Sequence, residues 1–460
     1  MRAILLMAVL LGGWAALECG AGELRFPPPD FESGHVMPET EYPSARAAAW
    51  AWVDVAVLLG ALGWATWLVH RGRSRRGVVW VSVFSVLYFG FFREGCVCAI
   101  GSVQNVALAL GGHGYALPVT VGMFFAAPLV FALFFGRTFC AAVCPHGALQ
   151  DLVLVRPVRV PRWLESGLGL VPYLFLGAGV AFAATGAAFV ICRLDPFIPI
   201  FRTSGGMGMV VTGGVLLAVG MFVGRPYCRF LCPYGALLRV VSALSKWRVR
   251  VTPDVCTSCR LCPEACPYDA IREADPVPAR PAVLGQARRR VVGWLVGLPL
   301  LMAAGALLGG WAGGAASRLD PTVRLMALRA EVLGGGTTDG WRHSDRLALE
   351  RADREADELN LQAAQTRERF RTAGIGFGVW SGLVVGWRLI SLGMVRRRTE
   401  FEPDRAACVA CARCFESCPQ ERIRLGLAPE PVSVAMTPRV LPGSVVPGSK
   451  AGGCGCGGTP

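Results

Sequence analysis

The stretch GRTFCAAVCPHGAL occupies residues 136–149, and GRPYCRFLCPYGAL repeats its pattern at residues 224–237. Each copy follows a long apolar run and contains two cysteines in the arrangement Cys-x3-Cys-Pro. The pairs are Cys140 with Cys144, and Cys228 with Cys232. Because residues four apart on a helix share a face, each pair can present two thiols toward the interior of a helical bundle. The repeat therefore predicts two equivalent cysteine-bearing segments at the ends of membrane helices.

The composition is that of a protein with several membrane spans. Hydrophobic residues make up 53% of the chain and charged residues only 17%, and several apolar runs reach the roughly 20 residues that cross a bilayer. We expect an all-α transmembrane helical bundle of six or seven spans. The expected spans are 49–69, 78–92, 116–135, 168–191, 206–223, 291–312 and 373–395. The second is short, and the stretch CVCAIGSVQNVALALG at 96–111 is expected to complete it as a re-entrant piece.

Arginine-rich loops set the expected orientation. The stretch RGRSRR at 71–76 and the arginine triplets at 288–290 and 396–398 fall on the same face as the two cysteine repeats. Because short basic loops stay in the cytoplasm, we expect a periplasmic amino terminus and a cytoplasmic carboxyl terminus in a bacterial inner membrane. The net charge of +14 follows from this topology, and nucleic-acid binding is not expected.

Two further motifs, CTSCRLCPEACP at 256–267 and CVACARCFESCP at 408–419, have the spacing C-x2-C-x2-C-x3-C-P. This is the bacterial ferredoxin spacing for 4Fe–4S clusters, in which the fourth cysteine ligates the other cluster. The expected ligands are Cys256, Cys259, Cys262, Cys266, Cys408, Cys411, Cys414 and Cys418. A zinc ribbon fits less well, because it normally uses two Cys-x2-Cys pairs without the additional cysteine.

The two ferredoxin motifs are separated by the last two expected spans, which return the chain to its starting face. We therefore expect the two halves to meet in the cytoplasm as one small α+β ferredoxin-like module. One cluster would then use Cys256, Cys259, Cys262 and Cys418, and the other would use Cys408, Cys411, Cys414 and Cys266. Independent four-cysteine clusters in each half are the alternative.

The chain divides into seven expected parts. They are a signal peptide or anchor at 1–22, a periplasmic segment at 23–48, the transmembrane bundle at 49–245, ferredoxin half 1 at 246–287, a transmembrane hairpin with a periplasmic helical loop at 288–395, ferredoxin half 2 at 396–428 and a disordered tail at 429–460. The apolar start with one early arginine is typical of a secretory signal, and the Gly- and Pro-rich end is typical of disorder.

The remaining cysteines are candidate redox thiols. The four repeat cysteines are enough ligands for one further intramembrane cluster or for two redox disulfides. The alternative is a structural helix-end motif in which Pro and Gly shape the turn and the thiols stay reduced. Cys96, Cys98 and Cys192 are expected toward the outer face, as a disulfide or an outer redox station. Haem is not expected, because the chain has no Cys-x2-Cys-His and its five histidines are not paired within spans.

These motifs, together with GRTFCAAVCPHGALQD and CRLDPF, resemble those of NosR/NapH/NirI-type polytopic membrane 4Fe–4S proteins, or polyferredoxins. The resemblance implies electron transfer, often from quinol, toward periplasmic reductases or their maturation systems. Many NosR-like members also carry an external flavin domain, but the sequence before the first span is short, so flavin is expected only on a separate partner. The resemblance implies an electron-transfer subunit, such as a quinol dehydrogenase component, rather than a stand-alone enzyme with catalytic residues.

FixG/RdxA-type oxidase-assembly proteins share these motifs, and that resemblance implies copper reduction. They usually end in an immunoglobulin-like domain, which the short Gly-rich tail does not predict. We therefore expect a membrane iron–sulfur protein with two 4Fe–4S clusters. It would pass electrons between the quinone pool or reduced ferredoxin and a periplasmic reductase or flavoprotein. A redox-sensing regulator and a copper reductase or maturation factor are the alternatives.

Overall fold

The computed structural model describes residues 48–95, 98–112, 114–203, 206–251, 256, 259–271, 281–335, 356–394 and 401–427. Within these ranges the chain is mostly helical and contains no strand, and one isolated antiparallel bridge joins Ile271 to Pro403. The expected signal peptide, nearly all of the periplasmic segment, the tail and Cys96 lie outside the described residues. The expected all-α bundle is confirmed, whereas an α+β ferredoxin fold is not.

The described elements up to the second repeat are α2 (Ala48–His70), α3 (Arg75–Ser85), η1 (Val86–Phe92), α4 (Ala99–Leu110), α5 (Val119–Phe135), η2 (Phe139–Val143), α6 (Pro145–Leu152), α7 (Arg162–Leu168), α8 (Val171–Ala184), α9 (Val190–Arg193), α10 (Ile198–Arg202) and α11 (Met207–Gly220). Those that follow are α12 (Pro226–Phe230), α13 (Pro233–Ala243), α14 (Leu261–Glu264), α15 (Pro281–Ala316), η3 (Ser317–Leu319), α16 (Pro321–Leu333), α18 (Ala356–Gly393), α19 (Arg413–Ser417) and α20 (Pro419–Arg424).

Five of the described helical stretches are long and apolar enough to cross a membrane: Ala49–His70, Arg75–Phe92, Trp163–Ala184, Gly285–Ala316 and Asp357–Gly393. They overlap five of the seven expected spans, and they place the protein in a membrane. The helices at the other two expected spans, α5 and α11, are shorter. Helix α5 ends because Gly136 leaves the helix with a φ of +77°, a conformation that glycine adopts without steric cost. The expected count of seven is therefore not confirmed.

A tight turn between α2 and α3 carries basic side chains to one end of the bundle. The turn is closed by Ser74, whose side chain accepts a hydrogen bond of 3.2 Å from the backbone N–H of Gly77. A serine at this position satisfies one of the N–H groups that a helix start leaves without a partner. Arg73 and Arg75 flank this cap and both contact ferredoxin half 2: Arg73 pairs with Glu421, and Arg75 donates to the carbonyl of Cys411.

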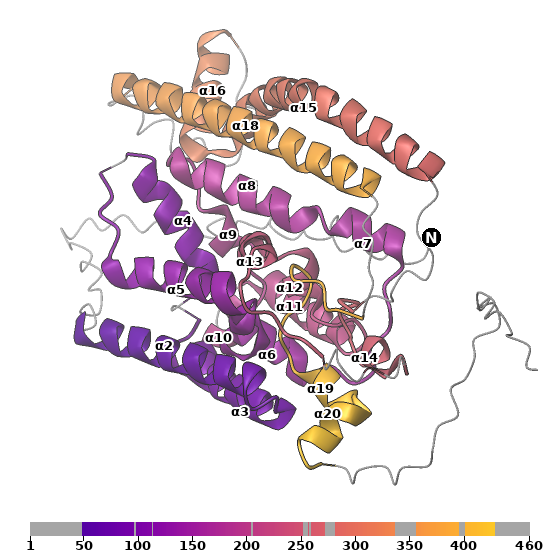
Figure 1. Ribbon diagram of the computed structural model, residues 1–460. Coiled ribbons are helices and arrows are strands. Elements are labelled where there is room, and N and C mark those ends of the chain that lie inside the picture. Colours follow the sequence, from indigo (N-terminus) through magenta and orange to yellow (C-terminus); the bar gives the residue numbers. More distant parts are fainter. Residues whose placement is uncertain are drawn as a thin grey trace, which may run out of the picture.

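Helices α15 and α18 form a long hairpin along the outside of α8 (Figure 1). Glycines line the contact between them: Gly305, Gly309 and Gly313 on α15, and Gly374, Gly378 and Gly382 on α18. Small residues let membrane helices approach until their backbones touch. The indole N–H of Trp380 on α18 donates to the carbonyl of Tyr173 on α8 at 2.7 Å, which ties the hairpin to the bundle.

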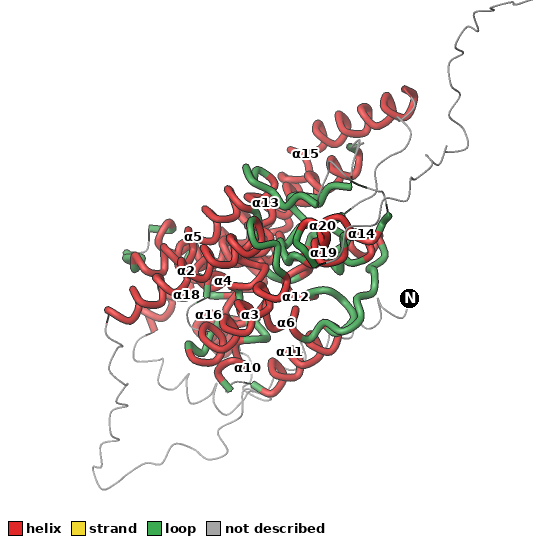
Figure 2. The backbone as a smooth tube through the Cα atoms, turned by 60° about the horizontal axis from the view of Figure 1, so that its bottom comes forward, coloured by secondary structure: helices red, strands yellow, loops and turns green. Residues whose placement is uncertain are grey.

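The two ferredoxin halves lie side by side at one end of the bundle. Helix α14 of half 1 contacts α19 of half 2, and Figures 1 and 2 both show α14, α19 and α20 grouped together. The backbone N–H of Asp404 donates to the carbonyl of Ala270 at 2.8 Å next to the Ile271–Pro403 bridge. The hairpin thus returns half 2 to half 1, although the two are far apart in the sequence.

Candidate iron–sulfur site and the cysteine repeats

Each cysteine pair of the repeats spans a junction between two helices. Cys140 lies in η2 and Cys144 precedes α6, while Cys228 lies in α12 and Cys232 precedes α13. The residue before a proline is pushed into an extended conformation, and ψ is 118° at Cys144 and 115° at Cys232. Proline is well suited to the first turn of the helix that follows. The two cysteines of each pair are therefore separated by a bend, and they do not share the single helical face that their spacing predicted.

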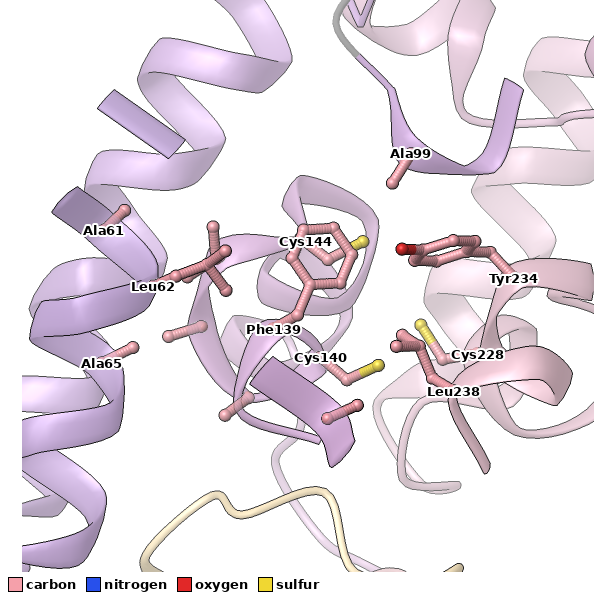
Figure 3. Packing of buried hydrophobic residues seen from close by; sticks show 14 of the residues in the cluster. Ala61, Leu62, Ala65, Ala99, Phe139, Cys140, Cys144, Cys228, Tyr234 and Leu238 are labelled. Carbon is pink, nitrogen blue, oxygen red and sulfur yellow. The ribbon is translucent and has the colours of Figure 1, made fainter. Parts of the chain in front are cut away.

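All four repeat thiols nevertheless belong to one buried apolar cluster, which also contains Phe139 and Tyr234. Figure 3 shows Cys140, Cys144 and Cys228 with their sulfur atoms in the space between the two repeats. Gly147 permits this close approach, because a Cβ there would lie 3.1 Å from the carbonyl oxygen of Cys140. The tertiary structure therefore brings together the thiols of both repeats.

Three of these thiols accept hydrogen bonds. The donors are Arg137 Nη2 to Cys140 Sγ at 3.8 Å, Gln150 Nε2 to Cys228 Sγ at 3.4 Å, and the Gly235 N–H to Cys232 Sγ at 3.2 Å. Hydrogen bonds directed at sulfur favour the thiolate, which is the form that binds metal. The site is therefore chemically compatible with an iron–sulfur cluster or with redox-active thiols.

The second residue of each repeat is a fully buried arginine. Arg137 donates from Nη1 to the carbonyl of Ala406 in half 2 at 3.3 Å. Arg225 donates to the carbonyls of Cys140 and, at 2.8 Å, Ala141, and its guanidinium lies 5.7 Å from the ring centre of Tyr268 in half 1. Buried charges need such partners, because desolvation is otherwise costly. Each repeat thus contacts a different ferredoxin half.

The cysteines of the two ferredoxin motifs are grouped across the halves. Burial raises the pKa of the Cys262 thiol to about 11, and the next cause is the neighbouring Cys418 thiol, followed by Cys256 and Cys259. Burial likewise raises the pKa of Cys408 to about 12, with Cys411 and Cys266 adding to the increase. Cys266, Cys408 and Cys411 also pack around one small apolar cluster formed by Tyr268, Ala270 and Val409.

This donor set matches what a 4Fe–4S cubane requires. Among the described residues, no three His, Cys, Asp or Glu side chains lie close enough together to share one metal ion, and every cysteine in those ranges is a free thiol. A cubane takes one thiolate on each of its four irons, so its ligands stand farther apart than the ligands of one ion. Thiolates are the ligands that such a cluster takes, so the cysteines of the two halves are chemically suited to hold one.

Cys98 and Cys192, two of the three cysteines expected to form an outer redox station, also lie near each other. Cys98 precedes α4 and its sulfur accepts from the backbone N–H of Ile100 at 3.3 Å. A Cβ added to Gly101 would lie 3.2 Å from the sulfur of Cys192 on the short helix α9. The expected partner Cys96 lies outside the described residues.

The histidine after the first cysteine pair has a buried acidic partner. His146 Nε2 lies 3.1 Å from Asp195 Oδ2, and Asp195 Oδ1 accepts from the backbone N–H of Phe197 at 3.0 Å. The ring of His146 stacks on Tyr227 of the second repeat. Phe197 of the CRLDPF stretch also packs against His146 and Tyr227, so this stretch contacts both repeats.

Sequence reasoning missed three buried charged residues of this site: Arg137, Arg225 and Asp151. The signal was present, because the Gly-Arg dipeptide opens both copies of the repeat. A charged residue repeated next to a membrane span is expected to be functional. What the sequence does not show is that these side chains face the ferredoxin halves.

Comparison with known proteins agrees with the motifs. The family model for a 4Fe–4S binding domain matches residues 117–162 and 205–252, which include both repeats. Protein YccM of Escherichia coli K12 is 33% identical over 156 residues, covering 30% of this chain and 43% of YccM. Protein NirI of Paracoccus denitrificans is 35% identical over 153 residues, covering 30% of this chain and 22% of NirI. The regulatory protein NosR of Pseudomonas aeruginosa is 28% identical over 215 residues, covering 41% of this chain and 28% of NosR.

The matched region thus spans less than half the length of these relatives, and no solved structure matches the chain significantly. The matches support a membrane protein that binds iron–sulfur clusters and has a redox role. The resemblance predicted from the motifs is confirmed: over its repeat-bearing core, this chain is a relative of the NosR/NirI-type membrane 4Fe–4S proteins.

Proposed function

We propose that the chain carries electrons across a bacterial inner membrane, between a quinol or cytoplasmic donor and a periplasmic redox system. The observation that carries this proposal is a succession of thiols. It runs from the ferredoxin halves through the buried repeat cysteines to Cys98 and Cys192. A hydrocarbon core of roughly 30 Å is too wide for one fast electron-tunnelling step, so a carrier in the middle is needed.

The ferredoxin halves would hold two clusters with crossed ligand sets. The grouping of Cys418 with Cys262, and of Cys266 with Cys408, supports this assignment over independent clusters in each half. When bound, 4Fe–4S clusters supply one-electron carriers whose potentials depend on nearby charge and on hydrogen bonds to sulfur. The chain's own part is to hold the eight thiolates at fixed positions and to keep water away from the buried ones.

The repeat cysteines would hold a further cluster inside the bundle. The 4Fe–4S family model matches the repeats themselves, and three of the four buried thiols have hydrogen-bond donors directed at sulfur. Redox disulfides are the alternative chemistry: two thiols would release two electrons and two protons on forming each bond. Arg137 supports a cluster over redox disulfides, because its positive charge lies beside Cys140 and would stabilise a thiolate ligand there.

Iron analysis separates these possibilities. Two cubanes alone would give about eight irons per chain, and a third cluster would raise that number. We expect more than eight irons in the wild type, and a fall to about eight when Cys140 or Cys228 is changed to Ala. A wild type with about eight irons that is unaffected by either change would remove the intramembrane cluster.

Electron flow tests the function itself. The protein would be reconstituted in vesicles with reduced ferredoxin or a quinol analogue on one side and an impermeant acceptor on the other. We expect electron flow that is lost when Cys418 is changed to Ala and kept when the adjacent Ser417 is changed to Ala. Absence of flow in the wild type with clusters loaded would contradict the proposal.

A redox-sensing regulator is the second candidate. It is favoured by one observation, the name "regulatory protein" carried by the relative NosR. A sensor needs clusters but no through-path, so it would load iron and still show no transfer across the vesicle membrane. The basic loops at 71–76, 288–290 and 396–398 support a cytoplasmic location of the clusters in either case. A flavin, where one is needed, would belong to a periplasmic partner.

A further inference from the structure

A single buried carboxylate, Asp151, lies where the bundle meets both ferredoxin halves. Its side chain is 1% exposed, and it lies near the end of α6, directly after the first repeat. Three side chains donate hydrogen bonds to it, Arg75 at 2.5 Å, Tyr268 at 3.0 Å and Arg413 at 3.3 Å, and Arg225 forms an ion pair with it at 3.5 Å. We call Asp151 and these four partners the ionic joint.

The partners come from four separate parts of the chain. Arg75 begins α3 and Arg225 opens the second repeat, so both belong to the bundle. Tyr268 follows the last motif cysteine of half 1, and Arg413 lies between Cys411 and Cys414 of half 2. The ionic joint is therefore a contact in which one carboxylate holds the bundle and both ferredoxin halves together.

The joint is also coupled to a cluster-binding loop. Arg75 uses Nη2 for Asp151 and Nη1 for the carbonyl of Cys411, the latter at 3.2 Å. Gly224, at the start of the second repeat, packs directly on half 1, since a Cβ there would lie 2.8 Å from the carbonyl oxygen of Pro267. Any shift of Asp151 would therefore move the loop that carries Cys411 relative to the repeats.

The charge balance of the joint is fixed. Burial raises the pKa of Asp151, but Arg225, Arg75 and Arg413 lower it more, and the net result lies well below its usual range. One negative charge thus offsets part of the positive charge of three arginines, of which Arg225 is fully buried and Arg75 and Arg413 are partly exposed. Losing that negative charge leaves more positive potential beside the thiolates of half 2, and positive charge favours the more negative, reduced form of a cluster.

We propose that Asp151 is a positioning residue that fixes both ferredoxin halves against the cysteine repeats and sets the potential of the cluster bound by Cys408, Cys411, Cys414 and Cys266. The inference rests on the proposed function, because it concerns the clusters that the ferredoxin halves would hold. The inference goes beyond the proposed function because it names the ionic joint as the contact through which electrons pass from the ferredoxin halves into the membrane bundle.

The test compares Asp151→Asn with a matched control, Glu402→Gln. Glu402 of half 2 pairs with Arg248 of half 1 at 2.7 Å, but its side chain is 38% exposed, so the loss of this ion pair should matter little. The full-length protein would be measured for iron content, cluster potentials, transfer across vesicles and backbone hydrogen exchange in half 2.

With Asp151→Asn, we expect unchanged iron content, one cluster potential shifted to a more positive value, and faster exchange at 401–412. Transfer should fall roughly tenfold, because breaking a buried ion pair is strongly unfavourable. Glu402→Gln should leave all four measurements unchanged. If Asp151 had only a structural role, Asp151→Asn would not shift the potential of one cluster while leaving the potential of the other cluster unchanged. Asp151→Asn behaving like Glu402→Gln would overturn the proposal.

Two further measurements keep the proposal falsifiable. Tyr268→Phe removes one donor without changing any charge, so it should speed exchange and slow transfer while leaving both potentials in place; a variant identical to the wild type would count against the joint. Asp151→Glu keeps the charge and should restore the wild-type potential. Wild-type protein without iron would refute the proposed function, whereas hydrogen exchange would still decide whether Asp151 docks half 2.

Discussion

The two repeats differ at the positions that their shared pattern leaves open. Where the first has His146, the second has Tyr234, and where the first continues with Gln150 and Asp151, the second continues with Leu238 and Arg239. Gln150 reaches across to the second repeat, donating to Cys228 Sγ at 3.4 Å and accepting from the backbone N–H of Tyr227 at 3.0 Å. The first repeat therefore supplies the polar side chains that hold the pair together.

Their identical Gly-Arg starts also serve different partners. Arg137 of the first repeat contacts half 2, whereas Gly224 and Arg225 of the second contact half 1. The two arginines at equivalent positions of the repeats thus contact different halves of the split module. This explains why the chain needs the phrase twice, and each prediction below separates one copy from the other.

The largest difference is expected between the two arginines. Arg225→Gln removes a buried charge that binds two carbonyls and Asp151, so it should destabilise the protein by about 3–5 kcal/mol. Arg137→Gln loses one carbonyl and one weak sulfur contact, and should cost about 1–2 kcal/mol. Unfolding of the detergent-solubilised protein would measure both. Equal losses of stability in the two variants would show that the two arginines contribute equally.

The next largest difference is expected between substitutions of two glycines, Gly224 and Gly136. A Cβ at Gly224 would lie 2.8 Å from the Pro267 carbonyl oxygen. Gly224→Ala should therefore destabilise the protein by about 1–3 kcal/mol through overpacking. Gly136 has open space around it but a φ of +77°, so Gly136→Ala should cost about 1 kcal/mol of backbone strain. Hydrogen exchange at 259–271 should rise only for Gly224→Ala. A rise for both variants would contradict a contact specific to the second repeat.

A smaller effect is expected at Tyr234. Its hydroxyl donates to the carbonyl of Phe125 at 2.7 Å, so Tyr234→Phe should cost about 1 kcal/mol and leave iron content unchanged. Tyr115→Phe is the matched control, because its hydroxyl makes an exposed contact of 3.3 Å with Asn105 and should have almost no effect. Thermal unfolding would compare the two. Loss of iron in Tyr234→Phe would instead assign this hydroxyl to the cluster site.

The smallest effect is expected from pH. The folded-state pKa of Asp151 is lowered because its three arginines outweigh burial, so its stabilising contribution is complete above the unfolded value of about 3.9 and is lost only as pH falls through the folded value. Burial raises the pKa of Tyr268, so its hydroxyl also keeps its proton between pH 5 and 8. The difference in half 2 exchange between the wild type and Asp151→Asn should therefore be constant in that range. A difference that disappeared by pH 5 would show that Asp151 is protonated there.

Most of the coarse architecture could be predicted from local patterns. The long apolar runs predicted the five helices that are able to span a membrane, and the cysteine spacing predicted iron–sulfur chemistry, which the family match supports. Two expected spans proved shorter, because α5 begins only at Val119, after Pro118, and α11 ends at Gly220. The predicted shared face of Cys140 and Cys144 failed for a similar reason, since Pro145 starts a new helix.

The sequence by itself determined which residues are the candidate ligands and which segments can span a membrane, because thiol spacing and apolar run length are properties of neighbouring residues. Only the tertiary structure decided which thiols meet and what holds them. Asp151 has partners at positions 75, 225, 268 and 413, and no local pattern links residues so far apart. A buried carboxylate can exist there only because folding brings enough donors to it to replace water.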